Sequence, residues 1–197
     1  MYKELAEKTR DGVAGNARLT GTAAAVLLVL LAAEGATIPF IGSLLEPHVF
    51  IGMLLIGPVL LKLSSTGYRF ARYYTGSEPY TRKGPPHIAL RLLAPGVVLT
   101  TLALFGTGVA LLVDGPPSNT LIFLHKLSFI AWVALMTLHV LGHLLEVPSL
   151  AAADWRRSGP REARRAGAGA RTLALGTSLL AGATLAVLTF SAAAPWF

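Results

Sequence analysis

The chain has 197 residues, of which 53% are hydrophobic and only 14% charged, and its mean hydropathy is +0.60. This composition excludes an ordinary soluble domain and indicates an integral membrane protein. The formal net charge is +7 and there is no cysteine, which excludes disulfides, cysteine-bound iron–sulfur clusters, thiolate ligation of haem and covalent c-type haem attachment.

Five apolar stretches follow a polar N-terminal segment, 1–18. Each is long enough for the roughly 20 residues that cross a hydrocarbon core of about 30 Å. In chain order they lie at about 19–38, 48–70, 88–113, 120–147 and 172–191. The first is not expected to be a cleaved signal peptide, because a polar segment precedes it and no small-x-small cleavage site with a soluble domain follows. The sequence therefore predicts an all-α membrane protein, a single bundle of five transmembrane helices.

Lysine and arginine are confined to alternate connections between these stretches. They occur in 1–18 and in the links after the second and fourth stretches, whereas 39–47, 114–119 and 192–197 contain none. By the positive-inside rule, this pattern predicts a cytoplasmic N-terminus and an external C-terminus in a bacterial-type plasma membrane. We interpret the net positive charge as a signal of topology, and it indicates no nucleic-acid binding.

Two histidines, His125 and His139, stand fourteen residues apart in the fourth stretch. In a helix the two rings lie about 21 Å apart along the axis and point in similar directions. Imidazole in hydrocarbon is costly, and such side chains usually line a site rather than face lipid. Two imidazoles on one face, one near each membrane surface, are what a helix needs to hold two haems across a bilayer. The alternative is that both rings only form bonds to neighbouring helices.

The predicted orientation places the histidines at two depths. His48 is expected to open the second helix at the outer face, level with His125, because both helices run from outside to inside. Gly52, four residues after His48, would let a porphyrin lie against the backbone. His139, His143 and His87 fall in the cytoplasmic half. This split predicts two haem b groups, with His48 and His125 as the axial ligands of the outer one.

The ligands of the inner haem are less closely defined. The spacing favours His139, with His143 one turn further as the alternative. His87, at the start of the third helix, is the only inner histidine on another helix, although it lies roughly two turns too low for His139. We keep His87 as the expected partner, and a single outer haem as the alternative.

Two basic residues in the inner half are further candidates for cofactor binding. Lys62 lies fourteen residues after His48, level with His139. It is expected to pair with a haem propionate or a quinone oxygen, unless it snorkels to the cytoplasmic surface. Arg91, near the inner surface, is a candidate for bidentate pairing with a propionate.

The spacing His125-x13-His139 resembles a ligand helix of the di-haem b-type integral membrane cytochromes. That group includes the cytochrome b subunits of bacterial formate dehydrogenases and hydrogenases. The resemblance covers about residues 48–143 and implies a haem-binding core from the second to the fourth helix. It implies an electron-transfer subunit, rather than a stand-alone enzyme, that connects a quinone pool with a partner oxidoreductase subunit. The chain departs in two ways from the more distantly similar respiratory quinol-oxidising cytochromes b: Lys62 stands where a second ligand histidine would be expected, and His87 is poorly placed.

Two other functions remain open from the sequence. One is a metal-handling transporter that uses His139, His143 and Glu146 as a chelating face, and the other is a structural subunit of a membrane complex. The fifth stretch carries a stripe of small residues, Ser178, Gly182 and Ala186, which would let another helix approach closely. We expect this stripe to pack against a second copy of the chain or a partner subunit.

Overall fold

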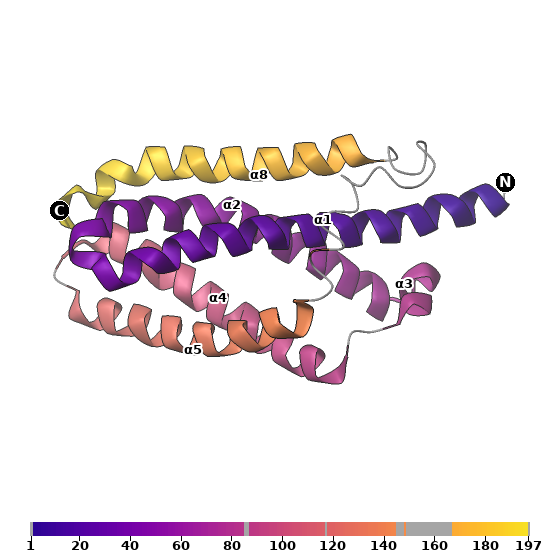
Figure 1. Ribbon diagram of the computed structural model, residues 1–197, viewed down its shortest axis with the longest axis horizontal. Coiled ribbons are helices and arrows are strands. Elements are labelled where there is room, and N and C mark those ends of the chain that lie inside the picture. Colours follow the sequence, from indigo (N-terminus) through magenta and orange to yellow (C-terminus); the bar gives the residue numbers. More distant parts are fainter. Residues whose placement is uncertain (1, 85–86, 117, 145–147, 149–166, 197) are drawn as a thin grey trace.

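The computed structural model describes residues 2–84, 87–116, 118–144, 148 and 167–196, and all regular structure in these ranges is helical. The long helices are α1 (Tyr2–Thr37), α2 (Ile41–Tyr74), α4 (Ile88–Asp114), α5 (Asn119–His143) and α8 (Ala168–Thr189). The short ones are η1 (Ile38–Phe40), α3 (Glu78–Lys83) and η2 (Phe190–Trp196). Figure 1 shows the long helices running alternately in opposite directions along one axis.

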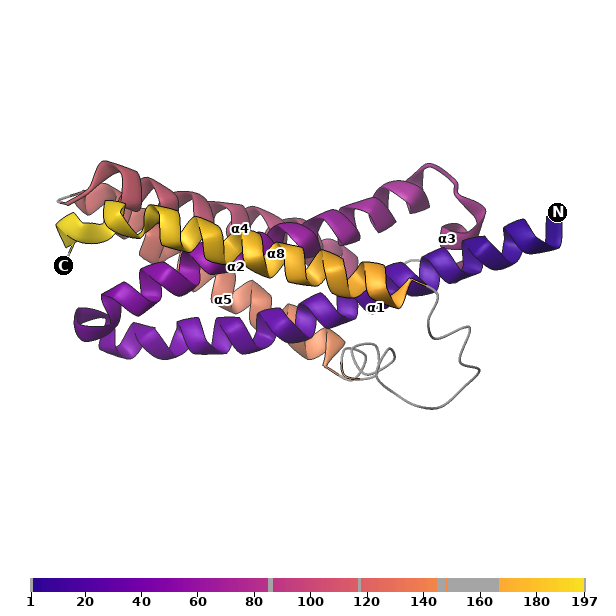
Figure 2. The same cartoon turned by 90° about the horizontal axis from the view of Figure 1, so that it is seen from above.

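Within the described residues, four helical segments are long and apolar enough to cross a membrane: Gly12–Tyr74, Ile88–Asp114, Asn119–His143 and Ala168–Trp196. The first has 63 residues because it includes both α1 and α2, which η1 joins into a hairpin (Figure 2). The predicted all-α, multi-pass membrane protein is therefore confirmed, with α1 and α2 as two antiparallel passes.

The connection between these two passes is shorter than the sequence predicts. The stretch 39–47, expected as a link, is almost entirely helical, and the chain turns through η1 and a kink at Leu44, where φ is −116° and ψ is 23°. Proline is tolerated at the start of a helix, so Pro39 in η1 does not prevent the chain from resuming a helix at Ile41. As a result, His48 lies inside α2 rather than opening it.

The backbones of α2 and α8 are in direct contact. A Cβ atom on Gly182 would lie 2.0 Å from the Leu54 carbonyl oxygen, and one on Gly57 would lie 2.0 Å from the Ser178 carbonyl oxygen. Ala186 is also buried, with 1% of its surface exposed. The small-residue stripe thus packs on α2 of the same chain, and the expectation that it meets a second copy or a partner is wrong for this face.

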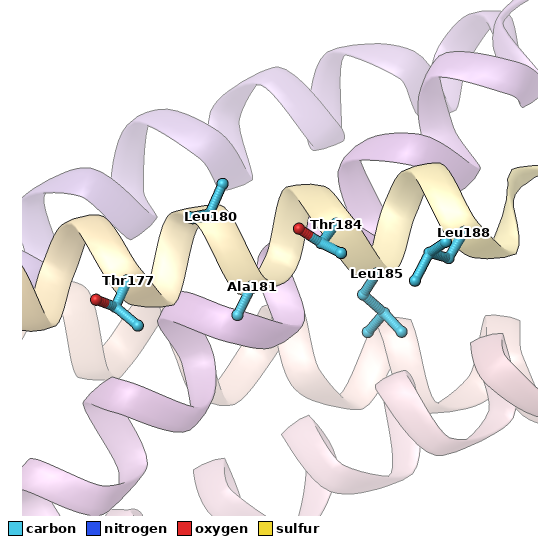
Figure 3. Close-up of a pocket in the computed structure, with 6 residues that line it drawn as sticks. All are labelled: Thr177, Leu180, Ala181, Thr184, Leu185 and Leu188. Atoms are coloured by element: carbon cyan, nitrogen blue, oxygen red, sulfur yellow. The ribbon is translucent and has the colours of Figure 1, made fainter.

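The exposed side of α8 is apolar. It carries a shallow depression of about 450 Å³ (Figure 3). The residues that line it all belong to this helix: Thr177, Leu180, Ala181, Thr184, Leu185 and Leu188. Leu180 and Leu188 are about 70% exposed, at 68% and 73%. In a membrane protein an exposed leucine surface of this kind suits contact with lipid chains.

The helices α4 and α5 form a second hairpin. The indole nitrogen of Trp132 donates a hydrogen bond of 3.0 Å to the Thr101 hydroxyl, and Gly96 admits the Leu135 side chain. No residue of α5 is buried, and its extensive contacts are with α4. Its remaining faces are therefore available to lipid or to a group that the protein holds.

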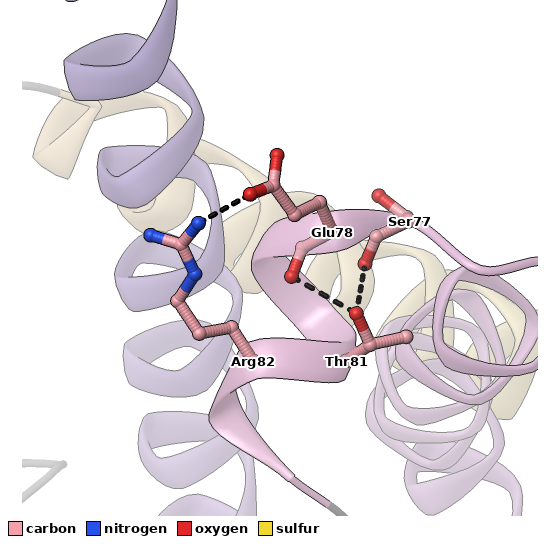
Figure 4. A network of polar contacts seen from close by, with 4 residues as sticks. All are labelled: Ser77, Glu78, Thr81 and Arg82. Atoms are coloured by element: carbon pink, nitrogen blue, oxygen red, sulfur yellow. Dashed lines mark hydrogen bonds and ion pairs between the residues drawn. The ribbon is translucent and has the colours of Figure 1, made fainter.

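A short helix that the sequence analysis did not predict, α3, follows α2. Glu78 and Arg82 form an ion pair one turn apart, and the Thr81 hydroxyl donates to the carbonyl oxygens of Ser77 and Glu78 (Figure 4). Both members of the ion pair are exposed, so the pair contributes little to stability. Tyr80, on the same helix, is buried and anchors α3 to the bundle.

Candidate functional site

The structure brings the side chains of His48 on α2 and His125 on α5 together. Their ring centres are 6.5 Å apart, and the ring planes are nearly perpendicular, at 86°. The two residues are separated by 77 positions in the sequence, and they meet because α2 and α5 run in the same direction (Figure 1). The sequence predicts both histidines at one depth of the membrane.

Two acceptors from α1 hold one nitrogen of the His48 ring. The Nδ1 atom lies 2.9 Å from the Thr37 hydroxyl and 3.1 Å from Oε1 of Glu34. The Thr37 hydroxyl donates its only proton to the Glu34 carbonyl oxygen, at 2.6 Å. With that proton engaged, the hydroxyl oxygen is available to His48 as an acceptor, an arrangement that favours the Nδ1–H tautomer of the neutral ring.

The His125 ring is held in the same way from α4. Its Nδ1 atom lies 3.0 Å from the Thr107 hydroxyl, which donates to the Ala103 carbonyl oxygen at 2.7 Å. The ring lies close to the backbone at Gly108, where a Cβ atom would be 3.2 Å from Cε1 of His125. This arrangement again favours the threonine as acceptor and the Nδ1–H tautomer of the neutral ring.

These tautomers leave Nε2 of both rings as the nitrogen with a lone pair for a metal ion. Histidine ligands usually donate their other N–H to an oxygen atom, as both rings do here. Two nitrogens bound to one metal ion at about 2.1 Å, with about 1.1 Å from each nitrogen to its ring centre, put the ring centres about 6.4 Å apart. At the observed 6.5 Å, both rings would therefore be able to hold one haem iron.

Gly52, expected to face a porphyrin, has a different neighbour. A Cβ atom at this position would lie 3.4 Å from Oε1 of Glu34. The absence of a side chain at Gly52 thus makes room for the Glu34 carboxyl group beside His48.

The sequence pattern did not link Glu34, Thr37 or Thr107 to the histidines. The sequence feature that could have indicated this contact is the position of Glu34 and Thr37 at the end of the first apolar stretch, only a short connection before His48.

The inner histidines lie together on α5. The ring centres of His139 and His143 are 4.9 Å apart. Nδ1 of His139 is buried without a hydrogen-bond partner, so no protein acceptor among the described residues holds this ring as the threonines hold His48 and His125. Lys62, expected at the level of His139, lies on α2.

Lys62 also belongs to a polar cluster between α1 and α2. Its Nζ atom donates to the Thr20 carbonyl oxygen at 3.0 Å, and the Thr20 hydroxyl lies 2.9 Å from that of Ser65. The Asn16 side chain donates to the Ser65 carbonyl oxygen at 3.1 Å, while its own Oδ1 is buried without a partner. Polar groups from α1 and α2 thus meet between these two helices.

The structure does not place His87 beside His139. His87 is the exposed N-cap of α4, and its Nδ1 accepts a hydrogen bond of 3.4 Å from the Ala89 amide. Arg91, one turn further, donates to the Tyr74 hydroxyl and lies over the Tyr74 ring, 5.9 Å from its centre. Both residues therefore have neighbours at the end of the bundle, in agreement with the depth offset seen in the sequence.

A metal-handling site has less support. Among the described residues there is no group of three or more histidine, cysteine, aspartate or glutamate side chains that could hold a metal ion. Glu146, the third member of the chelating face suggested by the sequence, lies outside the described residues.

Comparison of the chain with protein-family models, curated proteins and solved structures finds no match.

Proposed function

We propose that the protein is a b-type haem membrane cytochrome that transfers electrons across the bilayer, between a quinone pool and a partner oxidoreductase subunit. The observation that carries this proposal is the pair His48 and His125, with ring centres 6.5 Å apart and both Nδ1 atoms engaged by threonine. Haem iron, when bound, supplies a one-electron couple whose potential depends on its axial ligands and their surroundings.

The chain's own residues have three tasks in this proposal. Nε2 of His48 and of His125 would hold the outer haem, and the threonines at positions 37 and 107 keep each ring in the required tautomer. The helices exclude water and provide a medium of low polarity around the pair. In the inner half, His139 is the candidate ligand of a second haem, and Lys62 is the candidate partner of a propionate or a quinone oxygen.

The proposal is tested by a reduced-minus-oxidised absorption spectrum together with a count of haem per purified chain. We expect the Soret band of a b-type haem and a count of two. A colourless protein that cannot be loaded with haem would refute the function. A count of one would retain the outer site and refute the inner one.

The inner site is tested by replacing His139 with alanine. Because His139 is the candidate ligand of the inner haem, we expect His139→Ala to reduce the haem count from two to one while the outer haem keeps its spectrum. The control is His87→Ala, at an exposed position where we expect no spectral change. Loss of the same haem in both variants would instead make His87 a ligand.

The proposed orientation, with the N-terminus in the cytoplasm and the C-terminus outside, is tested with single cysteines. The chain has no cysteine of its own, so Asn119→Cys at the start of α5 and Thr81→Cys on α3 each give one exposed thiol. We expect a membrane-impermeant maleimide to label only the cysteine at position 119 in intact cells. Labelling of position 81 alone would reverse the orientation.

A further inference from the structure

We propose that α1 forms part of the outer site, and that Glu34 is a positioning residue for His48. Together with Thr37 it holds the Nδ1 proton of the ring and keeps the ring perpendicular to His125. The role toward haem rests on the proposed function, whereas the control of the ring's tautomer does not depend on haem.

The contacts at the end of α1 support this role. Oε1 of Glu34 and the hydroxyl of Thr37 lie 3.1 and 2.9 Å from the same nitrogen, Nδ1 of His48. The two acceptors are linked to each other, because the Thr37 hydroxyl donates to the Glu34 carbonyl oxygen. One turn of α1 thus offers two oxygen atoms to one N–H, and this arrangement limits rotation of the ring.

The surroundings of Glu34 indicate a functional group rather than a surface charge. Its side chain is 15% exposed, and Oε2 is buried without a hydrogen-bond partner. An acidic side chain inside a membrane bundle is costly and is a functional candidate by default. Among the described contacts, His48 is the side chain that the carboxyl group reaches. Gly52 leaves the space for it, since a Cβ atom there would contact Oε1 at 3.4 Å.

A carboxyl group in this place has a defined effect on a histidine ligand. It fixes the tautomer and the orientation of the ring and increases the basicity of the ligating nitrogen. Loss of such a partner typically weakens metal binding by about 10- to 100-fold. The angle between the rings also has a signature, because a low-spin ferric haem with perpendicular axial rings gives a strongly anisotropic electron paramagnetic resonance signal. The angle of 86° predicts this type of signal for the outer haem.

The first experiment uses the full chain without haem. Nitrogen NMR of the ¹⁵N-labelled histidine rings reports which ring nitrogen is protonated, and the His48 signal is assigned by its absence in His48→Ala. We expect the Nδ1–H form in the wild type and in Glu34→Gln, which keeps an acceptor oxygen. We expect a shift toward the Nε2–H form in Glu34→Leu and a complete change in Glu34→Leu/Thr37→Val. The matched control is Glu46→Leu, at an exposed position on α2.

The second experiment uses the haem-loaded protein. Glu34→Leu is expected to raise the haem dissociation constant by about 10- to 100-fold and to lose the strongly anisotropic signal, whereas Glu46→Leu changes neither. Thr37→Val, a change of similar volume, tests the second acceptor if Glu34→Leu does not fold. Unchanged tautomer, affinity and signal in Glu34→Leu and in Thr37→Val would overturn the inference and leave the cytochrome intact. A wild type that binds no haem would refute the proposed function, and the tautomer measurement would still decide the role of Glu34.

Discussion

Replacement of either His48 or His125 by alanine is expected to remove one haem per chain. The ring centres are 6.5 Å apart, a separation at which both rings would hold the same haem iron. The double variant should lose no more haem than either single variant, because residues that act as a unit are strongly non-additive. The measurement is the haem count per chain, with the reduced-minus-oxidised spectrum to identify the haem that remains.

Two controls separate ligand loss from loss of fold. His87→Ala removes an exposed imidazole and should leave the haem count unchanged. The helical content and the elution volume of each variant should match the wild type, because both positions are only partly buried. Full haem content in both His48→Ala and His125→Ala would exclude these residues as ligands, and the cytochrome proposal would lose its main support.

The pairing of His48 with His125 shows what helical periodicity and charge can predict. The distribution of lysine and arginine gives each helix a direction, and the direction gives each histidine a depth. These two properties were enough to expect His48 and His125 at one level. They do not give the rotation of a helix about its axis, so they do not predict which residues of the adjacent helices contact a given side chain. For this reason Glu34, on the adjacent helix α1, was not associated with His48 from sequence.

The ends of the helices were less predictable than their centres. The stretch 39–47 contains two prolines and no basic residue, which is typical of a link, yet η1 and the first turns of α2 occupy it. Proline is compatible with the first turn of a helix, so its presence alone does not define a loop. For His87, the depth predicted from sequence was a better guide to its position than its expected role as the partner of His139. This residue caps α4 at the end of the bundle and does not reach His139.

The small residues of α8 show a similar limit. A small-xxx-small stripe indicates that some helix approaches closely, but it does not identify that helix. In the structure the second helix is α2, which supplies its own small residue, Gly57, at the contact. The complementary glycine was visible in the sequence, but only the fold places it opposite Ser178 and Gly182.

Gly182→Ala is therefore expected to destabilise the monomer. The added Cβ atom would lie 2.0 Å from the Leu54 carbonyl oxygen, so α8 must move away from α2. Overpacking of this kind costs about 1–3 kcal/mol, more than the roughly 0.5–1 kcal/mol that alanine gains over glycine in a helix. Gly176→Ala, on the same helix with nothing within 4 Å of the new atom, keeps only the helix gain and should be neutral or stabilising.

The midpoint of unfolding in detergent micelles, followed by circular dichroism, should therefore fall for Gly182→Ala and stay the same or rise for Gly176→Ala. Gly57→Ala should behave like Gly182→Ala, because its Cβ atom would lie 2.0 Å from the Ser178 carbonyl oxygen on the other side of the same contact. If the stripe instead served association between chains, Gly182→Ala would change the oligomer size while the monomer kept its stability, and Gly57→Ala would have no such effect. A common loss of stability in Gly57→Ala and Gly182→Ala, without a change in oligomer size, is expected only if the two glycines pack α8 onto α2 within one chain.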